Sequence, residues 1–179
     1  VVSDTLGQPG QAGPNGEWTI CSDALPVDLF DLLDVSANLT GVWFNNGIPF
    51  DGVAEAGGDY IYIDYADVPC SNDTAFITLG IAQAAYAGEN GTLPVCADDP
   101  PVILFNALTG GAQAGGTWTG PDGSPHSGTF IPGTDAFGLY SYTVNAAEPC
   151  DADEAVLAVV LCEVGITEHV VNGTLAWLG

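Results

Sequence analysis

The sequence predicts an all-β protein made of two tandem β-sandwich modules. Three observations predict this architecture: an internal repeat, many short β-prone runs separated by turn residues, and two pairs of cysteines with a tryptophan between the members of each pair. The chain has 179 residues, including 24 Gly and 12 Pro, and 47% of its residues are hydrophobic. That composition is typical of a folded globular chain rather than of an acidic disordered one.

The repeat has an offset of 75 residues, which carries Ala12-Gly13-Pro14-Asn15-Gly16 onto Ala87-Gly88-Glu89-Asn90-Gly91. The same offset carries Cys21 onto Cys96 and Trp43 onto Trp118. After a five-residue insertion in the second copy, the aromatic run that begins at Tyr60 aligns with the run that begins at Tyr140. We therefore expect four segments: an N-terminal strand or linker (residues 1–11), a first module (12–86), a second module (87–163), and a tail that could supply an intersubunit strand (164–179).

Each module contains short β-branched or aromatic runs bounded by Gly, Pro, Asn and Asp, which predict strands. The expected strands are Gly41–Phe44, Tyr60–Tyr65, Thr74–Ile81, Gly116–Thr119, Leu139–Val144 and Ala155–Cys162. Short helical turns are expected only at Leu29–Leu33 and Val102–Leu108. A tryptophan between two cysteines is typical of an immunoglobulin-like core, so Trp43 and Trp118 are assigned to the cores of two immunoglobulin-like sandwiches.

Five cysteines predict covalent cross-links, because modules of this size bury only a modest core. The repeat favours Cys21 with Cys70 and Cys96 with Cys150, since these are equivalent pairs, and each bond would contribute about 4 kcal/mol in the chain-entropy model. Reduced thiols are the alternative. Cys162 aligns with Ala82 and is left as an unpaired thiol, either buried and inert or bridging to another molecule.

The charge excludes several classes of function. The chain has 23 Asp and Glu but no Lys or Arg, which gives a formal net charge of −23. Nucleic acids and anionic membranes are excluded as partners, because no basic side chain can neutralise phosphate groups. No apolar run is long enough to insert in a membrane, and the N-terminus resembles that of a processed chain. Neither His126 nor His169 has a neighbouring acid in sequence that would make a catalytic triad, so we expect no enzyme activity.

Acidic clusters raise the question of a metal. Asp98 and Asp99 are the preferred candidates for calcium, since carboxylates are hard oxygen ligands and we expect this pair near the junction of the modules. Solvated acidic loops are the commoner explanation of such clusters. No other cofactor is expected.

The motifs of the second module resemble a known family. They include Gly115-Gly116-Thr117-Trp118-Thr119, Gly128-Thr129-Phe130 and Tyr140-Ser141-Tyr142-Thr143-Val144. Together with the first module, which lacks the Gly-Thr-Phe element, residues 12–162 resemble the immunoglobulin-like surface repeats of Bacteroidetes adhesins and gliding-associated proteins. Residues 164–168 resemble the lead-in to the sorting domain of type IX secretion substrates. The resemblance implies export to the cell surface and a structural role without catalytic residues.

Glycosylation signals are frequent. Asn38, Asn72, Asn90 and Asn172 begin Asn-x-Ser/Thr sequons, where about one is expected by chance. The resemblance implies a different, O-linked signal, Asp-Thr followed by an apolar residue, which occurs at Thr5 and Thr74. The candidate sites are therefore Thr74 and Thr5, with Asn72 and Asn90 as alternatives.

The leading function is an extracellular adhesive or structural protein, a subunit of a surface filament. Apolar, β-prone segments at the chain ends could complete the sheet of a neighbouring copy and so propagate a head-to-tail homopolymer. The residues expected to carry assembly are Val1, Val2, Leu175, Trp177 and Leu178. The alternative is a carbohydrate-binding or calcium-dependent adhesion module with a glycan ligand.

Overall fold

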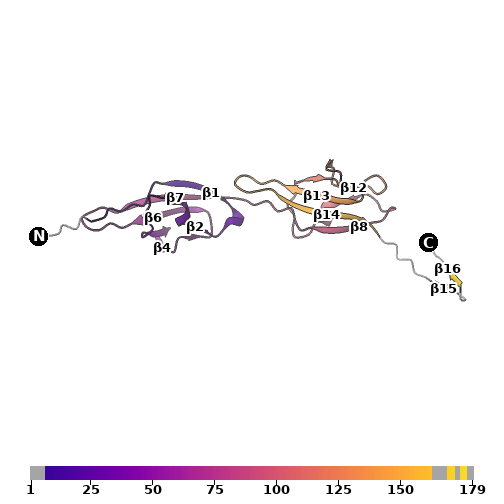
Figure 1. Ribbon diagram of the computed structural model, residues 1–179, viewed down its shortest axis with the longest axis horizontal. Helices are drawn as coiled ribbons and strands as arrows, with labels where there is room; N and C mark the ends of the chain where they lie inside the picture. Colours follow the sequence, from indigo (N-terminus) through magenta and orange to yellow (C-terminus); the bar gives the residue numbers. More distant parts are fainter. Residues whose placement is uncertain (1–6, 163–168, 172–173, 177–179) are drawn as a thin grey trace. The chain divides into compact units, whose positions relative to one another are not determined.

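The computed structural model describes residues 7–162, 169–171 and 174–176, and β-strands are the main regular secondary structure among them (Figure 1). Contacts divide the chain into two compact units. The first contains Val1–Ala84 together with Ala146–Asp151, and the second contains Ala85–Asn145 and Ala152–Gly179. The first unit therefore includes a short loop that belongs to the second repeat by sequence.

The first unit is built on a five-stranded sheet in the order β1-β7-β6-β3-β4, with a smaller sheet of β2 and β5. The strands are β1 (Gly16–Cys21), β2 (Val27–Asp28), β3 (Val42–Asn45), β4 (Ile48–Phe50), β5 (Val53–Ala54), β6 (Gly58–Asp64) and β7 (Asp73–Ala82).

The second unit repeats this topology as β8-β14-β13-β10-β11, with a smaller sheet of β9 and β12. The strands are β8 (Gly91–Val95), β9 (Val102–Ile103), β10 (Thr117–Thr119), β11 (Pro125–His126), β12 (Thr129–Phe130), β13 (Gly138–Val144) and β14 (Asp153–Leu161). Two further strands, β15 (His169–Val171) and β16 (Thr174–Ala176), pair with each other in the tail. The expectation of an all-β protein with two immunoglobulin-like sandwiches is confirmed.

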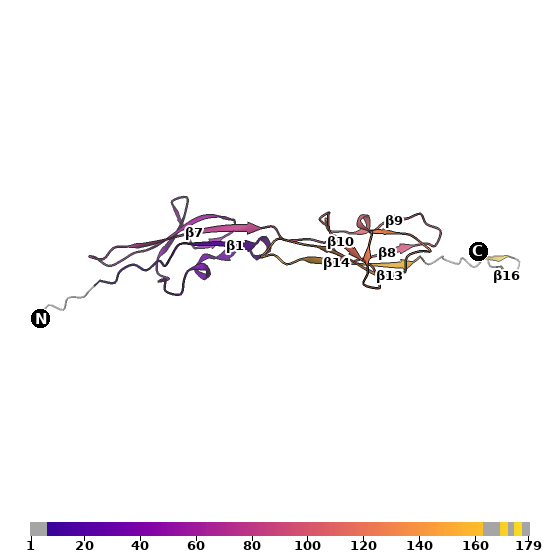
Figure 2. The same cartoon turned by 90° about the horizontal axis from the view of Figure 1, so that it is seen from above.

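The first strand of each unit runs parallel to the last strand, and the two lie side by side (Figure 2). Gly16 of β1 is opposite Ile77 of β7, and Cys21 is opposite Ala82. The sequence does not predict β1 or β8, because no hairpin turn links either strand to its distant partner. The other expected strands begin and end within two residues of the observed ones.

Short 3-10 helices occupy the two places where the sequence indicates helical turns. They are η2 (Leu29–Leu32) and η3 (Leu104–Ala107), while η1 (Ser22–Ala24) follows the end of β1. Leu29 and Leu104, the first residues of η2 and η3, are fully buried. Each short helix therefore anchors the smaller sheet to the core.

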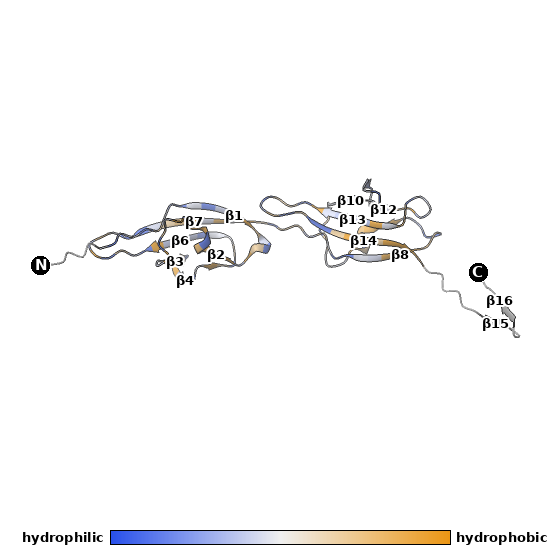
Figure 3. Ribbon diagram, in the orientation of Figure 1, coloured by the Kyte–Doolittle hydropathy of each residue, from blue (hydrophilic) through white to orange (hydrophobic). Residues whose placement is uncertain are grey.

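The two cores are centred on the tryptophans, as the sequence predicts. Trp43 is 1% exposed and Trp118 is 7% exposed. Each packs on a buried tyrosine, Tyr62 or Tyr142, with ring centroids 4.9 Å apart in both cases. Burial alternates along the strands, as in β14, whose buried residues Ala155, Leu157 and Val159 alternate with more exposed ones. Most of β14 is hydrophobic on both faces (Figure 3).

Two glycines bring the smaller sheet close to the tryptophans. Gly52 and Gly128 have φ of +90° and +81°, in the region that favours glycine. A Cβ atom would lie 2.7 Å from the indole ring in each case. The backbone N–H groups of Leu29 and Leu104 donate to the carbonyl oxygens of these glycines.

Within the described residues, no helix has the length and apolar character needed to cross a membrane.

Candidate functional site

The disulfides are the most distinctive chemical feature of the protein, and their connectivity corrects the sequence-based pairing. Cys21 is bonded to Cys150, with Cα atoms 5.0 Å apart, and Cys96 is bonded to Cys162, with Cα atoms 4.9 Å apart. Cys70 is a free thiol. The expected pairs Cys21–Cys70 and Cys96–Cys150 are therefore wrong, and so is the expectation that Cys162 is unpaired.

The parallel first strand explains why the expected pairs do not form. Cys21 lies opposite Ala82 at the end of β7, whereas Cys70 precedes the start of that strand. A strand of this length separates its ends by about 30 Å. A disulfide requires Cα atoms roughly 4.4–6.8 Å apart, so the two sulfurs of one repeat cannot meet. The same argument separates Cys96 from Cys150 at opposite ends of β14.

The second unit joins its first and last strands directly. Cys162 follows β14 and continues its ladder, because its backbone N–H donates to the carbonyl oxygen of Val95 at 3.0 Å. That pairing places Cys162 beside Cys96. The alignment of Cys162 with Ala82 was the available signal, since it shows that one repeat has a cysteine where the other has none.

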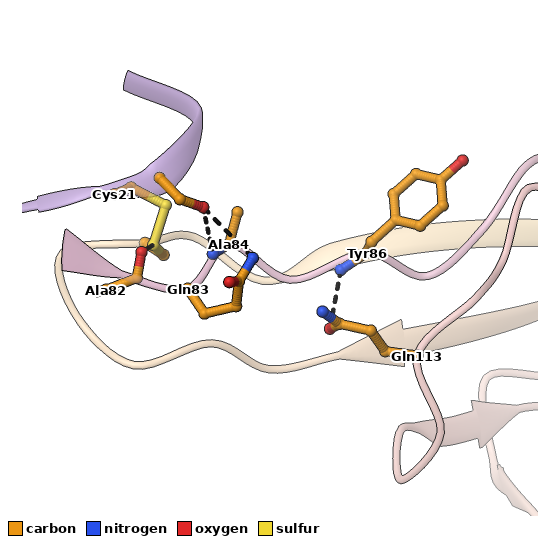
Figure 4. Close-up of a disulfide and its surroundings, with 8 residues drawn as sticks. Cys21, Ala82, Gln83, Ala84, Tyr86 and Gln113 are labelled. Atoms are coloured by element: carbon orange, nitrogen blue, oxygen red, sulfur yellow. Dashed lines mark hydrogen bonds between the residues drawn. A yellow bond between two sulfur atoms is a disulfide. The ribbon is translucent and has the colours of Figure 1, made fainter. Parts of the chain in front are cut away.

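The last strand of the first unit has no cysteine, because Ala82 stands where the second repeat has Cys162. Cys150, which lies in a loop, bonds to Cys21 instead. Cys150 lies in the segment Ala146–Asp151, and its Sγ is 3.5 Å from the carbonyl oxygen of Ala82. Figure 4 shows the disulfide beside the backbone from Ala82 to Ala84. The hydroxyl of Ser22, next to Cys21, accepts the N–H of Ala84 at 3.0 Å. The bond thus ties the end of β1 to the Cys150 loop beside the end of β7.

A histidine and a carboxylate lie together in the second unit, with Nε2 of His126 3.5 Å from Oδ2 of Asp135. Nδ1 of His126 accepts the N–H of Gly128 at 3.1 Å, so the proton of the neutral ring lies on Nε2. Oδ2 of Asp135 also accepts the N–H of Ile131 at 2.6 Å. Both ring nitrogens are used in structural contacts, and this side chain is not positioned as a general base. The sequence does not indicate this pair, because His126 lies on β11 and Asp135 lies in the loop that follows β12.

The calcium candidates lie at an end of the second unit that the sequence did not indicate. Asp98 and Asp99 follow β8, at the end of the sheet opposite Ala87, so the expectation that they lie near the junction is wrong. Their carboxylates come within 4.8 Å of each other and of the Cys96 sulfur. However, that sulfur is bonded to Cys162, and Asp99 Oδ2 already accepts the N–H of Cys96 at 2.8 Å. Calcium binding at this pair stays a prediction.

The glycosylation candidates occupy different environments. Thr74 lies within β7, in agreement with the expected strand Thr74–Ile81, and is half-buried. Asn72 Oδ1 accepts the N–H of Ala66, and Asn90 Oδ1 accepts that of Val156. Both asparagines thus have structural roles. Glycan attachment stays a prediction at each of these positions, and Thr5 lies outside the described residues.

The assembly candidates are mostly outside the described part of the chain. Leu175 lies in β16, opposite Val170 of β15. Val1, Val2, Trp177 and Leu178 lie outside the described residues.

A surface groove in the first unit contains an aromatic side chain that the core does not use. Trp18, on the edge strand β1, is 45% exposed. It lines a cavity of about 270 Å³ together with Asp31 and Asp34. Hydrogen bonds from the hydroxyl and the backbone N–H of Ser36 lower the pKa of Asp34, so this carboxylate is ionised at neutral pH.

No protein-family model matches the chain, and neither does any curated protein. Among solved structures it is similar to the I-band fragment I67–I69 from titin, with 13% identity, a TM-score of 0.43, and coverage of 69% of this chain and 55% of that one. It is also similar to the N-terminal four Ig domains of Dscam1 isoform 6.9, with 14% identity, a TM-score of 0.38, and coverage of 84% and 44%. The chain thus spans about half the length of these structures. The assignment of the fold rests on the strand order and the sandwich cores described above.

Proposed function

We propose that this protein is an extracellular structural or adhesive protein, a subunit of a cell-surface filament that assembles through strand addition. Two disulfides support an extracellular location, because such bonds persist in oxidising compartments and are rare in the cytosol. The absence of Lys and Arg makes long-range attraction between copies impossible. Assembly must therefore use short-range contacts that bury apolar surface and satisfy backbone hydrogen bonds.

One edge strand carries the proposal. The two five-stranded sheets have four edges, formed by β1, β4, β8 and β11. Proline interrupts three of them, at Pro49, Pro94 and Pro125, and proline on an edge discourages the addition of another strand. The fourth edge, β1, contains no proline and exposes Trp18. It is the edge best suited to receive an end segment of another copy, either residues 166–179 or residues 1–6.

The repeat supplies a matched test. Thr19 of β1 aligns with Pro94 of β8, and both positions are exposed on a strand that runs parallel to the last strand. Thr19→Pro should therefore preserve the fold of the first unit while blocking strand addition. Salt screens the repulsion between the acidic copies, so assembly should increase with salt concentration. In light scattering across a salt series, we expect Thr19→Pro to lose this assembly and Pro94→Thr to retain it.

Deletion of residues 172–179 and, separately, of residues 1–6 then identifies the inserted segment. Assembly of Thr19→Pro to the same extent as the unmodified protein, or an intact protein that stays monomeric across the salt series, would contradict the proposal.

A second candidate function, carbohydrate binding, is favoured by the groove at Trp18. An exposed indole beside two carboxylates offers a face on which a sugar can stack and acceptors for its hydroxyl groups. Titration of neutral oligosaccharides, followed by tryptophan fluorescence, tests this function. Binding should be lost in Trp18→Ala and retained in Thr19→Pro, which separates it from assembly.

A further inference from the structure

Cys70 is the free cysteine of the protein, and it lies in the loop that connects β6 to β7. The thiol donates to the carbonyl oxygen of Gly7 at 3.2 Å. The backbone N–H of Cys70 donates to the carbonyl oxygen of Asp67 at 2.8 Å, which closes a turn. The side chain is half-buried.

Cys150 occupies the same place in the second repeat, and there it is bonded. Both cysteines stand three residues before the last strand of their repeat, at Asp73 and Asp153. The N–H of Cys150 closes the same turn, with the carbonyl oxygen of Ala147 at 3.0 Å. Its sulfur lies against the carbonyl oxygen of Ala82, as that of Cys70 lies against Gly7.

The carbonyl groups of Gly7 and Ala82 occupy equivalent positions in the repeat, because the two residues are separated by the repeat offset of 75 residues. The segments that follow them are also held alike. The N–H of Ala12 donates to Asp73 at 2.9 Å, and the N–H of Ala87 donates to Asp153 at 2.8 Å. The segment Gly7–Ala12 therefore contacts the loop of Cys70 in the same way as the segment Ala82–Ala87 contacts the loop of Cys150.

Cys150 bonds to Cys21 because it lies beside Ala82, the last residue of β7. Ala82 is opposite Cys21 in the parallel ladder, so a sulfur that reaches the carbonyl group of Ala82 also reaches the sulfur of Cys21. If Gly7 likewise followed a last strand, the first-strand cysteine of that module would lie beside Cys70. The sequence before Gly7 fits such a strand, since Val1-Val2-Ser3 aligns with Phe76-Ile77-Thr78 of β7.

We propose that Cys70 is an intermodular disulfide site, whose sulfur bonds to the cysteine at the end of the first strand of a further immunoglobulin-like module joined ahead of Gly7. A second copy of this chain supplies no such thiol, because Cys21 and Cys96 are both already bonded. The bond forms by thiol–disulfide exchange with a small disulfide oxidant such as oxidised glutathione. The two protein thiols become one disulfide, and the oxidant accepts two electrons and two protons to become two thiols. The assignment does not depend on filament assembly.

The test supplies the missing module from the chain itself. Residues 1–75 are fused directly ahead of Val1 of the full chain, with Cys70 of the added copy changed to Ser. In a second fusion, residues 1–82, again with Cys70 of the added copy changed to Ser, precede Gln8, which gives the added module an unaltered β7. Each protein is oxidised with glutathione, alkylated, and mapped by mass spectrometry after cleavage at acidic and aromatic residues, since trypsin has no site in the chain.

We expect a peptide that joins Cys21 of the added copy to Cys70 of the full chain, and no alkylated cysteine. In the unextended chain Cys70 should be the single alkylated residue. Changing Cys70 of the full chain to Ser in the fusion should leave Cys21 of the added copy as the single alkylated residue. The proposal is overturned if Cys21 of the added copy and Cys70 of the full chain are both alkylated in both fusions while Cys21 of the full chain is bonded to Cys150. It is also overturned if Cys70 of the full chain bonds to Cys21 of its own repeat.

Discussion

The two repeats use the same hydrogen bonds to build the same sandwich. The hydroxyl of Tyr62 accepts the N–H of Gly41 and donates to the carbonyl oxygen of Asn38, and Tyr142 does the same with Gly116 and Gln113. In each repeat an asparagine at the start of the first strand, Asn15 or Asn90, accepts an N–H of the last strand. These contacts satisfy backbone groups that no ladder reaches.

The repeats differ in their cysteines and in a buried charge. Asp64 is 3% exposed at the end of β6, where the second repeat has the buried Val144. Its carboxylate accepts the N–H of Gln11, the amide of Asn38 and the hydroxyl of Thr40. Both repeats therefore share the side chains that satisfy backbone groups, whereas the cross-links and the buried charge differ between them.

The largest expected effect comes from breaking the disulfide of the second unit. Replacing both Cys96 and Cys162 by Ser should lower the free energy of unfolding of that unit by about 4 kcal/mol, because the unfolded chain regains the entropy of a closed loop. Differential scanning calorimetry should show one transition lowered and the transition of the first unit unchanged. Cys70→Ser is the control and should alter neither transition; an unchanged second unit would contradict the loop-entropy argument.

Asp64 should make the first unit sensitive to acid. Burial raises the pKa of this carboxyl, but the hydrogen bonds from Gln11, Asn38 and Thr40 outweigh burial, so its pKa lies below the ordinary value of 3.8. A lowered pKa in the folded state stabilises the protein fully above pH 3.8, and this stability is lost as the pH falls through the folded-state pKa.

Asp64→Asn removes the charge and should cost about 3 kcal/mol at neutral pH, because it weakens three hydrogen bonds to a carboxylate. Denaturant unfolding at several pH values measures both effects. The difference between the unmodified protein and the variant should shrink in acid. A difference that is independent of pH would rule out the ionised carboxylate as its source.

The smallest effect tests whether the shared hydrogen bonds are equivalent. Tyr62→Phe and Tyr142→Phe each leave a backbone N–H and a carbonyl group without the hydroxyl that they share. Each change should cost about 2 kcal/mol, and each should affect only its own unit in calorimetry. Unequal losses would show that the two sandwiches depend on this contact to different extents.

The sequence predicts the sandwich cores well, because Trp43, Trp118 and the alternating strands mark the buried face directly. It does not predict β1 or β8, whose partners are distant in sequence and parallel to them. The pairing of Cys21 depends on that register, so an alignment of cysteines alone assigned it wrongly. The contact of His126 with Asp135 was likewise set by loop geometry that sequence spacing does not encode.

The disulfides also determine how the chain carries tension. A pull between Gly7 and Cys162 passes along the backbone to Cys21, through the sulfur atoms to Cys150, and along the backbone again to Cys162. The residues from Ser22 to Pro149 lie outside this covalent path, so they bear no load once the path is fully extended. At about 3.5 Å per residue the stretched length is limited to about 100 Å, compared with about 550 Å for the reduced chain. In mechanical terms the oxidised protein is a short tether that resists further extension, and reduction of the Cys21–Cys150 disulfide allows the longer extension.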